Sequence, residues 1–280
     1  MLNYILFVIS LFIGVVCDVI SKQLSLNINT YQIVFFRFSF CALLLFFLFK
    51  IKFNLNELKN YFTRGIILFF AIFLWIIGLQ KSSISNASFF GLLIPIITIQ
   101  LAYYFLNDKL SLKQLLYSFL CFLITICYLL YKKYSLILNI KNDVFFIISV
   151  VLFSSAEIIN KKYTNQNYIK DAFGVCCIVG IISFCAVIQQ FKMPSISDFT
   201  ILFLLGLLSA VMYYCLFRSY RYCRISIISS FRYFEIVIAV TIDYFLFEEV
   251  IDKLTLIMVI SLIYCNIKIY KLTTMLQIAI

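Results

Sequence analysis

The sequence predicts an all-α integral membrane protein with ten transmembrane helices in two inverted five-helix repeats. Three observations predict this fold class. The chain is extremely apolar, its apolar runs have the length of membrane-spanning helices, and its two halves resemble each other.

The composition is that of a protein that dissolves in lipid. Of 280 residues, 64% are hydrophobic and 12% are charged, whereas a soluble domain is about half apolar and a quarter charged. A soluble fold of this size lacks the interior to bury so much apolar surface. Lipid-spanning segments are helices or closed barrels, because every backbone polar group needs an internal partner. The apolar runs are about 20 residues long, which favours helices over the shorter strands of a barrel.

Turn residues and charges divide the chain into ten predicted spans. The first is interpreted as a retained span and not a signal peptide, because it has no basic leader and no small-residue cleavage site. No break between spans is long enough for a soluble domain. The spans cover about residues 2–20, 31–49, 65–80, 84–106, 112–131, 144–160, 172–191, 199–217, 225–247 and 254–272.

Basic residues predict the orientation. The net charge is +11, which in a soluble protein suggests nucleic acid; here the Lys and Arg residues lie in short loops, so topology explains them and no nucleic acid is expected. With a cytoplasmic N-terminus, fourteen basic residues fall in inside loops and ends, seven in outside loops and two within spans. Cytoplasmic loops carry an excess of Lys and Arg, so we expect a multi-pass inner-membrane protein with both termini in the cytoplasm.

The two halves match at an offset near 140 residues. Residues 17–22 resemble residues 156–161, at the end of each half's first span, and residues 104–108 resemble 244–248, at the end of the fourth. The domain division is therefore a five-helix repeat over 1–135 and a second over 136–280. Five is odd, so the second copy enters the membrane inverted, as in alternating-access carriers with a midplane site. Chance similarity among apolar segments is the alternative, but the matching charged positions favour a repeat.

Charged residues inside spans are the candidates for a binding site, because each costs about 3 kcal/mol at the membrane centre and usually faces a cavity or partner. Arg37 lies about two turns into the second span, and Arg232 about two turns into the ninth. Glu235 follows Arg232 at i+3 on the same face. We interpret Arg232 as a contact for a substrate carboxylate and Glu235 as a contact for an amine or another cation. The alternative for Arg232 and Glu235 is an ion pair that merely neutralises itself.

Two acids occupy equivalent positions near helix ends. Asp18 precedes Lys22 by four residues, and Glu157 precedes Lys161 by four, so each pair shares a helix face. Inversion places Asp18 near the outer side and Glu157 near the inner side, where they could act as gates or contact a cation. The alternative is a pair of helix-end residues that extend toward the headgroups.

Two aromatic residues are candidate pocket walls. Trp75 is the only Trp and lies in the middle of its span instead of at an interface, and Tyr233 adjoins Arg232. A buried indole needs a partner for its N–H group. Packing alone is the alternative for both residues.

Nothing in the sequence indicates an enzyme. There is no His, and G-x-G-x-x-G, P-loop and G-x-S-x-G patterns are absent. The ten Cys residues include no C-x-x-C pair and are read as small apolar fillers. We therefore expect no catalytic residues, no cofactor and no metal, and the sequence makes no prediction of oligomeric state.

A series of short segments, spread over most of the chain, has an order and spacing that are typical of a known carrier family. The segments are Asp18-Val19-Ile20-Ser21-Lys22, Phe35-Phe36-Arg37-Phe38, Arg64-Gly65-Ile66-Ile67-Leu68-Phe69-Phe70 followed by Trp75, Phe105-Leu106-Asn107, Ile158-Ile159-Asn160-Lys161-Lys162 and Phe231-Arg232-Tyr233-Phe234-Glu235. Through these segments the chain resembles the EamA branch of the drug/metabolite transporter superfamily, and within it the rickettsial carriers that take up S-adenosylmethionine. It departs from the branch at residues 229–231, Ser-Ser-Phe, where Ala-Pro is more common.

The resemblance implies a secondary transporter that imports S-adenosylmethionine, with exchange for S-adenosylhomocysteine as one route. It implies that Glu235, Asp18 or Glu157 meets the cations of this substrate and that Arg232 or Arg37 meets its carboxylate. Trp75 and Tyr233 would then stack on adenine or face the sulfonium. Two other hypotheses remain open: an EamA-type carrier of another small metabolite, such as an amino-acid exporter, and a membrane enzyme or scaffold without transport.

Overall fold

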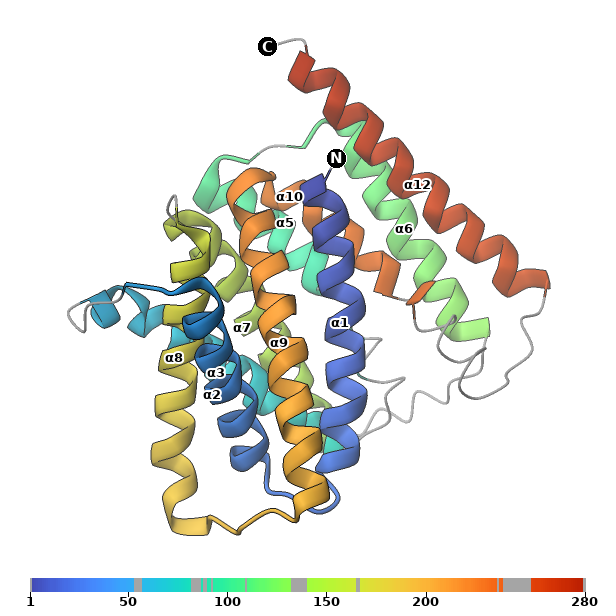
Figure 1. Cartoon of the computed structure of the whole chain (residues 1–280). Helices are drawn as coiled ribbons and strands as arrows, with labels where there is room; N and C mark the ends of the chain where they lie inside the picture. The colour runs from blue at the N-terminus through green and yellow to red at the C-terminus, as the bar shows by residue number, and fades with distance from the viewer. Residues whose placement is uncertain are drawn as a thin grey trace.

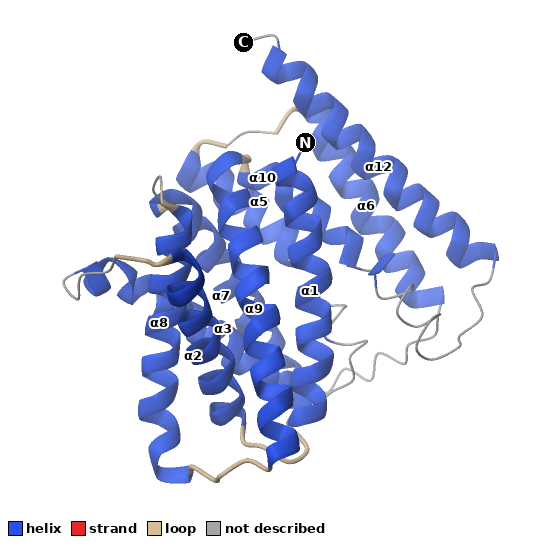
Figure 2. Cartoon of the chain, in the orientation of Figure 1, coloured by secondary structure: helices blue, strands red, loops and turns tan. Residues whose placement is uncertain are grey.

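The computed structural model describes residues 2–52, 57–81, 87, 90–91, 93–108, 110–131, 140–164, 167–235, 237–238 and 253–278. Within these residues the secondary structure is helical and contains no strand (Figure 2). The first half contains α1 (Leu2–Leu24), α2 (Thr30–Phe49), α3 (Leu58–Lys81), α5 (Leu93–Leu106) and α6 (Leu112–Tyr131). The second contains α7 (Ile140–Tyr163), α8 (Tyr168–Val187), η2 (Ile188–Gln190), α9 (Ile196–Tyr222), α10 (Ile225–Ser230), η3 (Phe231–Tyr233) and α12 (Lys253–Ile278).

Polar caps fix where several helices begin. The side chain of Asn29 accepts a hydrogen bond from the backbone N–H of Tyr31 (3.2 Å) at the start of α2. Ser195 does the same for Asp198 (3.1 Å) at the start of α9. These side chains satisfy N–H groups that have no partner within the helix. At the other end of α2, Lys50 adopts a left-handed conformation (φ 46°) that stops the helix.

The helices form a bundle with a separate pair at its side (Figure 1). In the bundle α1 packs against α9, α2 against α8 and α9, and α3 against α7 and α8. Helices α6 and α12 pack against each other beside this bundle. Helix α1 begins and α12 ends at the same end of the molecule (Figure 1).

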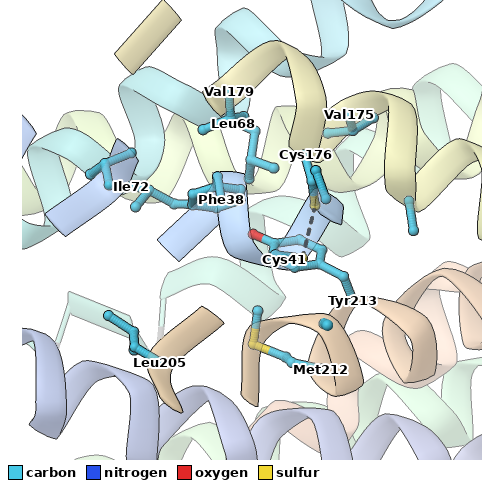
Figure 3. Close-up of a cluster of buried hydrophobic side chains, with 14 of the residues drawn as sticks. Phe38, Cys41, Leu68, Ile72, Val175, Cys176, Val179, Leu205, Met212 and Tyr213 are labelled. Atoms are coloured by element: carbon cyan, nitrogen blue, oxygen red, sulfur yellow. Dashed lines mark hydrogen bonds between the residues drawn. The ribbon is translucent and has the colours of Figure 1, made fainter. Parts of the chain in front are cut away.

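The main core lies where α2, α3, α8 and α9 meet. Figure 3 shows Phe38 and Cys41 of α2 beside Cys176 of α8 and Tyr213 of α9, and all four are buried. The Cys41 thiol donates to the Cys176 sulfur at 3.5 Å. All ten cysteines are free thiols.

The outer surface of the bundle is apolar as well. Phe47 and Leu48 of α2 are each 70% exposed, so this helix is hydrophobic on both its inner and outer faces, as expected for a helix in lipid. By length and composition, six of the described helices can cross a membrane: α1, α2, α3, α8 with η2, α9 and residues 144–163 of α7. Two shorter apolar stretches cover Leu93–Leu106 and Leu112–Ile124.

The structure moves several predicted boundaries. Helix α3 begins at Leu58 instead of residue 65, and α8 at Tyr168 instead of residue 172. The span predicted at 225–247 is not one continuous α-helix, because α10 ends at Ser230 and η3 follows it. Ile and Ser have only modest helix propensity, and the Ser230 hydroxyl donates to the carbonyl of Ser226 (3.2 Å), a contact that often bends helices. Residues 236 and 239–247 of that span, and 84–86, 88–89 and 92 of the span predicted at 84–106, lie outside the described residues.

Candidate functional site

A cavity of about 210 Å³ lies inside the bundle. Helices from both halves of the chain line it, including α1, α2 and α3 from the first and α7 and α9 from the second. Most of the lining is apolar, but five charged side chains of the described residues reach it: Asp18, Arg37, Glu157, Arg232 and Glu235. Ligand sites in proteins commonly combine apolar walls with a few polar groups that converge on the ligand.

Arg232 joins two acids in one cluster. Its Nη1 donates to Glu235 Oε1 at 3.1 Å, and its Nη2 contacts Glu157 Oε1. Glu157 also accepts a hydrogen bond from Thr98 Oγ1 of α5 at 3.1 Å. The side chain of Glu157 is only 5% exposed, whereas that of Glu235 is 30% exposed. The cluster therefore ties α5, α7 and the η3 turn together, and Glu235 is its open side.

The η3 turn explains how Arg232 reaches α7. Arg232 lies in the middle of the 3₁₀ segment Phe231–Tyr233, directly after α10 ends. A 3₁₀ segment within a helix often marks a functional or strained position. The flanking residues Phe231 and Tyr233 are buried, so packing holds the turn in place.

Asp18 meets Trp75 across the cavity wall. The indole Nε1 of Trp75 in α3 donates to Oδ2 of Asp18 in α1 at 3.1 Å. The Trp75 ring packs edge-on against Phe146 and Phe153 of α7. This bond satisfies the indole N–H inside an apolar bundle and fixes the position of the carboxylate.

Arg37 enters the cavity from α2. Its side chain is buried, with 4% of the residue exposed, and its Nε donates to Ser209 Oγ of α9 at 2.9 Å. Its guanidinium carbon lies 5.8 Å from the ring centre of Phe38. Within the described part of the chain, Arg37 has no ion-pair partner.

Six of the seven residues singled out from the sequence line this cavity: Asp18, Arg37, Trp75, Glu157, Arg232 and Glu235. Tyr233 does not line it, because its side chain packs in a second apolar cluster with residues of α1, α6, α10 and α12. Its proposed contact with a substrate has no support in this arrangement.

The pairings predicted along single helices differ from those observed. Glu157 pairs with Arg232 and not with Lys161, four residues further on. Lys161 Nζ instead donates to the carbonyl oxygens of Tyr220 (2.6 Å) and Cys223 (2.7 Å) at the end of α9. Asp18 and Glu157 also line one shared cavity; whether they act as separate gates stays a prediction.

A buried polar cluster next to the cavity was missed in the sequence. Arg64 of α3 donates to Asn160 of α7 (2.8 Å) and pairs with Asp171 of α8 (3.3 Å). Arg64 and Asp171 are nearly fully buried, and Asn160 also lines the cavity. Both charged residues directly precede predicted spans, so they were placed in loops. The sequence signal that could have identified them is that each charged residue lies directly at the edge of an apolar run.

Sequence comparison identifies the family. A model of the EamA-like transporter family matches residues 1–130 and 140–265, which is most of the chain. The chain belongs to the EamA-like transporter family. Together with the apolar helices, this membership makes it a multi-pass membrane protein of the transporter class.

Several relatives of this EamA-like transporter are named S-adenosylmethionine uptake transporters. One from Rickettsia conorii is 28% identical over 256 residues, covering 89% of this chain and 86% of the relative. One from Rickettsia bellii is 27% identical over 256 residues and covers 89% and 87%. A solved crystal structure matches with a TM-score of 0.72 at 12% identity, covering 92% of this chain and 95% of that chain; this likeness concerns the fold alone.

Proposed function

We propose that this EamA-like transporter is a secondary carrier that imports S-adenosylmethionine across the bacterial inner membrane, with S-adenosylhomocysteine as an exchange partner. The names of the rickettsial relatives support the substrate. The charged cavity is the single observation that carries the proposal. It brings five charged side chains together inside an apolar bundle, where charged groups are costly unless they serve a pathway or a partner.

An inverted repeat accounts for how the helices pair. Suppose that α1 corresponds to α7, α2 to α8 and α3 to α9. A two-fold relation then converts the α1–α9 contact into the α7–α3 contact. The same relation converts α2–α9 into α8–α3, and all four contacts occur. This pairing supports two oppositely oriented five-helix repeats over 1–135 and 136–280, with ten spans in all. Residues from both repeats then line the cavity, as alternating access requires.

The proposed orientation has both termini in the cytoplasm. The excess of Lys and Arg in the loops assigned to the inside supports it. The start of α1 and the end of α12 lie at the same end of the molecule (Figure 1), which supports an even number of crossings. A reporter enzyme active only in the cytoplasm, fused to the C-terminus, tests this orientation; an inactive fusion in well-inserted protein would overturn it.

Uptake of labelled S-adenosylmethionine tests the proposed function. Cells that lack their own carrier for this compound and express the chain should accumulate label above cells that carry an empty vector. Unlabelled S-adenosylmethionine and S-adenosylhomocysteine should compete, and adenosine should compete less. Absence of uptake by well-inserted protein would exclude this substrate and favour a carrier of another small metabolite, such as an amino-acid exporter.

A further inference from the structure

The charges that line the cavity do not balance. Asp18, Glu157 and Glu235 contribute three carboxylates, and Arg37 and Arg232 contribute two guanidinium groups. With all five groups ionised, one negative charge is therefore left over among the described residues that line the cavity. An uncompensated charge inside a membrane protein is costly, so a cargo with one net positive charge should be bound in preference to a neutral one.

The two arginines are not equivalent. Arg232 already contacts two carboxylates, those of Glu157 and Glu235. Arg37 is held by a neutral hydroxyl and has no ion-pair partner within the described part of the chain. Arg37 is therefore the guanidinium that remains available for the carboxylate of a cargo.

Asp18 is the matching acid for an ammonium group. Its Oδ2 accepts from Trp75, and among the described residues no basic group forms an ion pair with it. It lies within electrostatic range of Arg37, but beyond ion-pair distance. An α-amino acid carries its ammonium and its carboxylate on one carbon. Its ammonium can therefore face Asp18 while its carboxylate faces Arg37 in the same cavity.

Glu235 is left for a second cation. Glu157 is not available to a cargo, because Arg232 contacts one of its carboxylate oxygens and Thr98 donates a hydrogen bond to the other. Only Oε1 of Glu235 contacts Arg232, and the side chain is the more exposed of the two. Its carboxylate interacts electrostatically with that of Asp18, and both residues line the same cavity.

We propose that the cavity selects a cargo with one carboxylate and two cationic groups, in which Arg37 and Asp18 bind the amino-acid end and Glu235 faces a sulfonium. This inference deepens the proposed function and rests on it for the identity of the site. Its consequence is selectivity by charge: the sulfonium compound S-adenosylmethionine binds more tightly than the thioether S-adenosylhomocysteine, which lacks the second positive charge.

The test uses two matched ligand pairs and purified full-length protein in detergent. Affinities are measured by titration calorimetry for S-adenosylmethionine against S-adenosylhomocysteine, and for S-methylmethionine against methionine. In both pairs the compounds differ by a sulfonium in place of a thioether. We expect the wild type to favour the sulfonium compound by about tenfold in each pair, the equivalent of about 1.4 kcal/mol.

The variant Glu235→Gln should reduce both ratios toward one, because the loss of affinity falls mainly on the sulfonium compound of each pair. Glu57→Gln is the matched control: it removes the same charge from a partly exposed residue that pairs with Lys170 and does not line the cavity, and it should leave both ratios unchanged. Equal affinities within each pair in the wild type would overturn the inference, whatever the fate of the variants. So would an unchanged ratio in Glu235→Gln.

Failure of the two proposals can be told apart. Selective binding of sulfonium compounds without uptake in cells would contradict the transport function alone. Uptake of S-adenosylmethionine by a protein that binds both members of each pair equally would contradict the charge selectivity alone.

Discussion

Arg232 illustrates how a single residue serves both the fold and the site. It is 14% exposed, and its guanidinium group contacts carboxylates from α7 and from its own segment. Charged side chains in such surroundings are tolerated because their partners neutralise them. The sequence suggested a choice between a self-neutralising pair with Glu235 and a contact with substrate, but the structure adds Glu157 as a partner on a separate helix.

Removing Arg232 should therefore destabilise the protein as well as impair uptake. Arg232→Ala leaves the buried carboxylate of Glu157 without its cation, and breaking a buried pair in this way costs about 3–5 kcal/mol. The double variant Arg232→Ala/Glu157→Gln removes both charges and should recover a large part of the loss. Thermal unfolding of the detergent-purified variants measures this. Equal melting temperatures for the single and double variants would contradict the structural role assigned to the pair.

At the scale of elements, close helix contact depends on small residues. A Cβ atom added to Gly206 of α9 would collide with the Cβ of Phe40 in α2, and this atom cannot rotate away because it is bonded to the backbone. Glycine permits such close approach between membrane helices. The α2–α9 contact also places Ser209 beside Arg37, so the packing of these helices positions a residue of the site.

We expect Gly206→Ala to destabilise the protein by about 1–3 kcal/mol, the usual cost of overpacking a filled interface. Gly14→Ala is the matched comparison for stability, because the added methyl group would lie 3.7 Å from the sulfur of Met212, an ordinary contact distance. Its melting temperature should be at or above that of the wild type, since Ala favours helix more than Gly. A Gly206→Ala protein as stable as Gly14→Ala would show that the α2–α9 interface is looser than described.

For the whole molecule, apolar runs of the right length predicted most of the helices that the structure describes. The cost of burying charges selected all five charged side chains that line the cavity among the described residues. Both arguments rest on local patterns, so they succeed where one segment decides the outcome. The cross-helix partners of Glu157, Arg64 and Arg37 depend on packing between segments that are distant in sequence. The position of Tyr233 in the second apolar cluster depends on packing in the same way, because the sequence does not show on which side of the η3 turn its side chain lies.

The relation between the two halves connects the site to transport. The helix pairs α1–α9 and α3–α7 each join one half to the other, and the charged cavity lies among these four helices. A cargo held there would touch both halves at once. Under the alternating access proposed for this carrier, the cavity would open to either side as the two halves move relative to each other.

Exchange in reconstituted vesicles tests the central claim, that S-adenosylmethionine crosses the membrane through this cavity. Purified protein is placed in lipid vesicles loaded with unlabelled S-adenosylmethionine, and labelled compound is added outside. We predict rapid accumulation of label in vesicles with wild-type protein and at least a tenfold slower rate with Arg37→Gln, because about 1.4 kcal/mol of lost carboxylate binding has this effect. Arg221→Gln, at an exposed position outside the cavity lining, should match the wild type. Label that enters protein-containing vesicles no faster than protein-free ones, or equally fast with Arg37→Gln, would contradict the account.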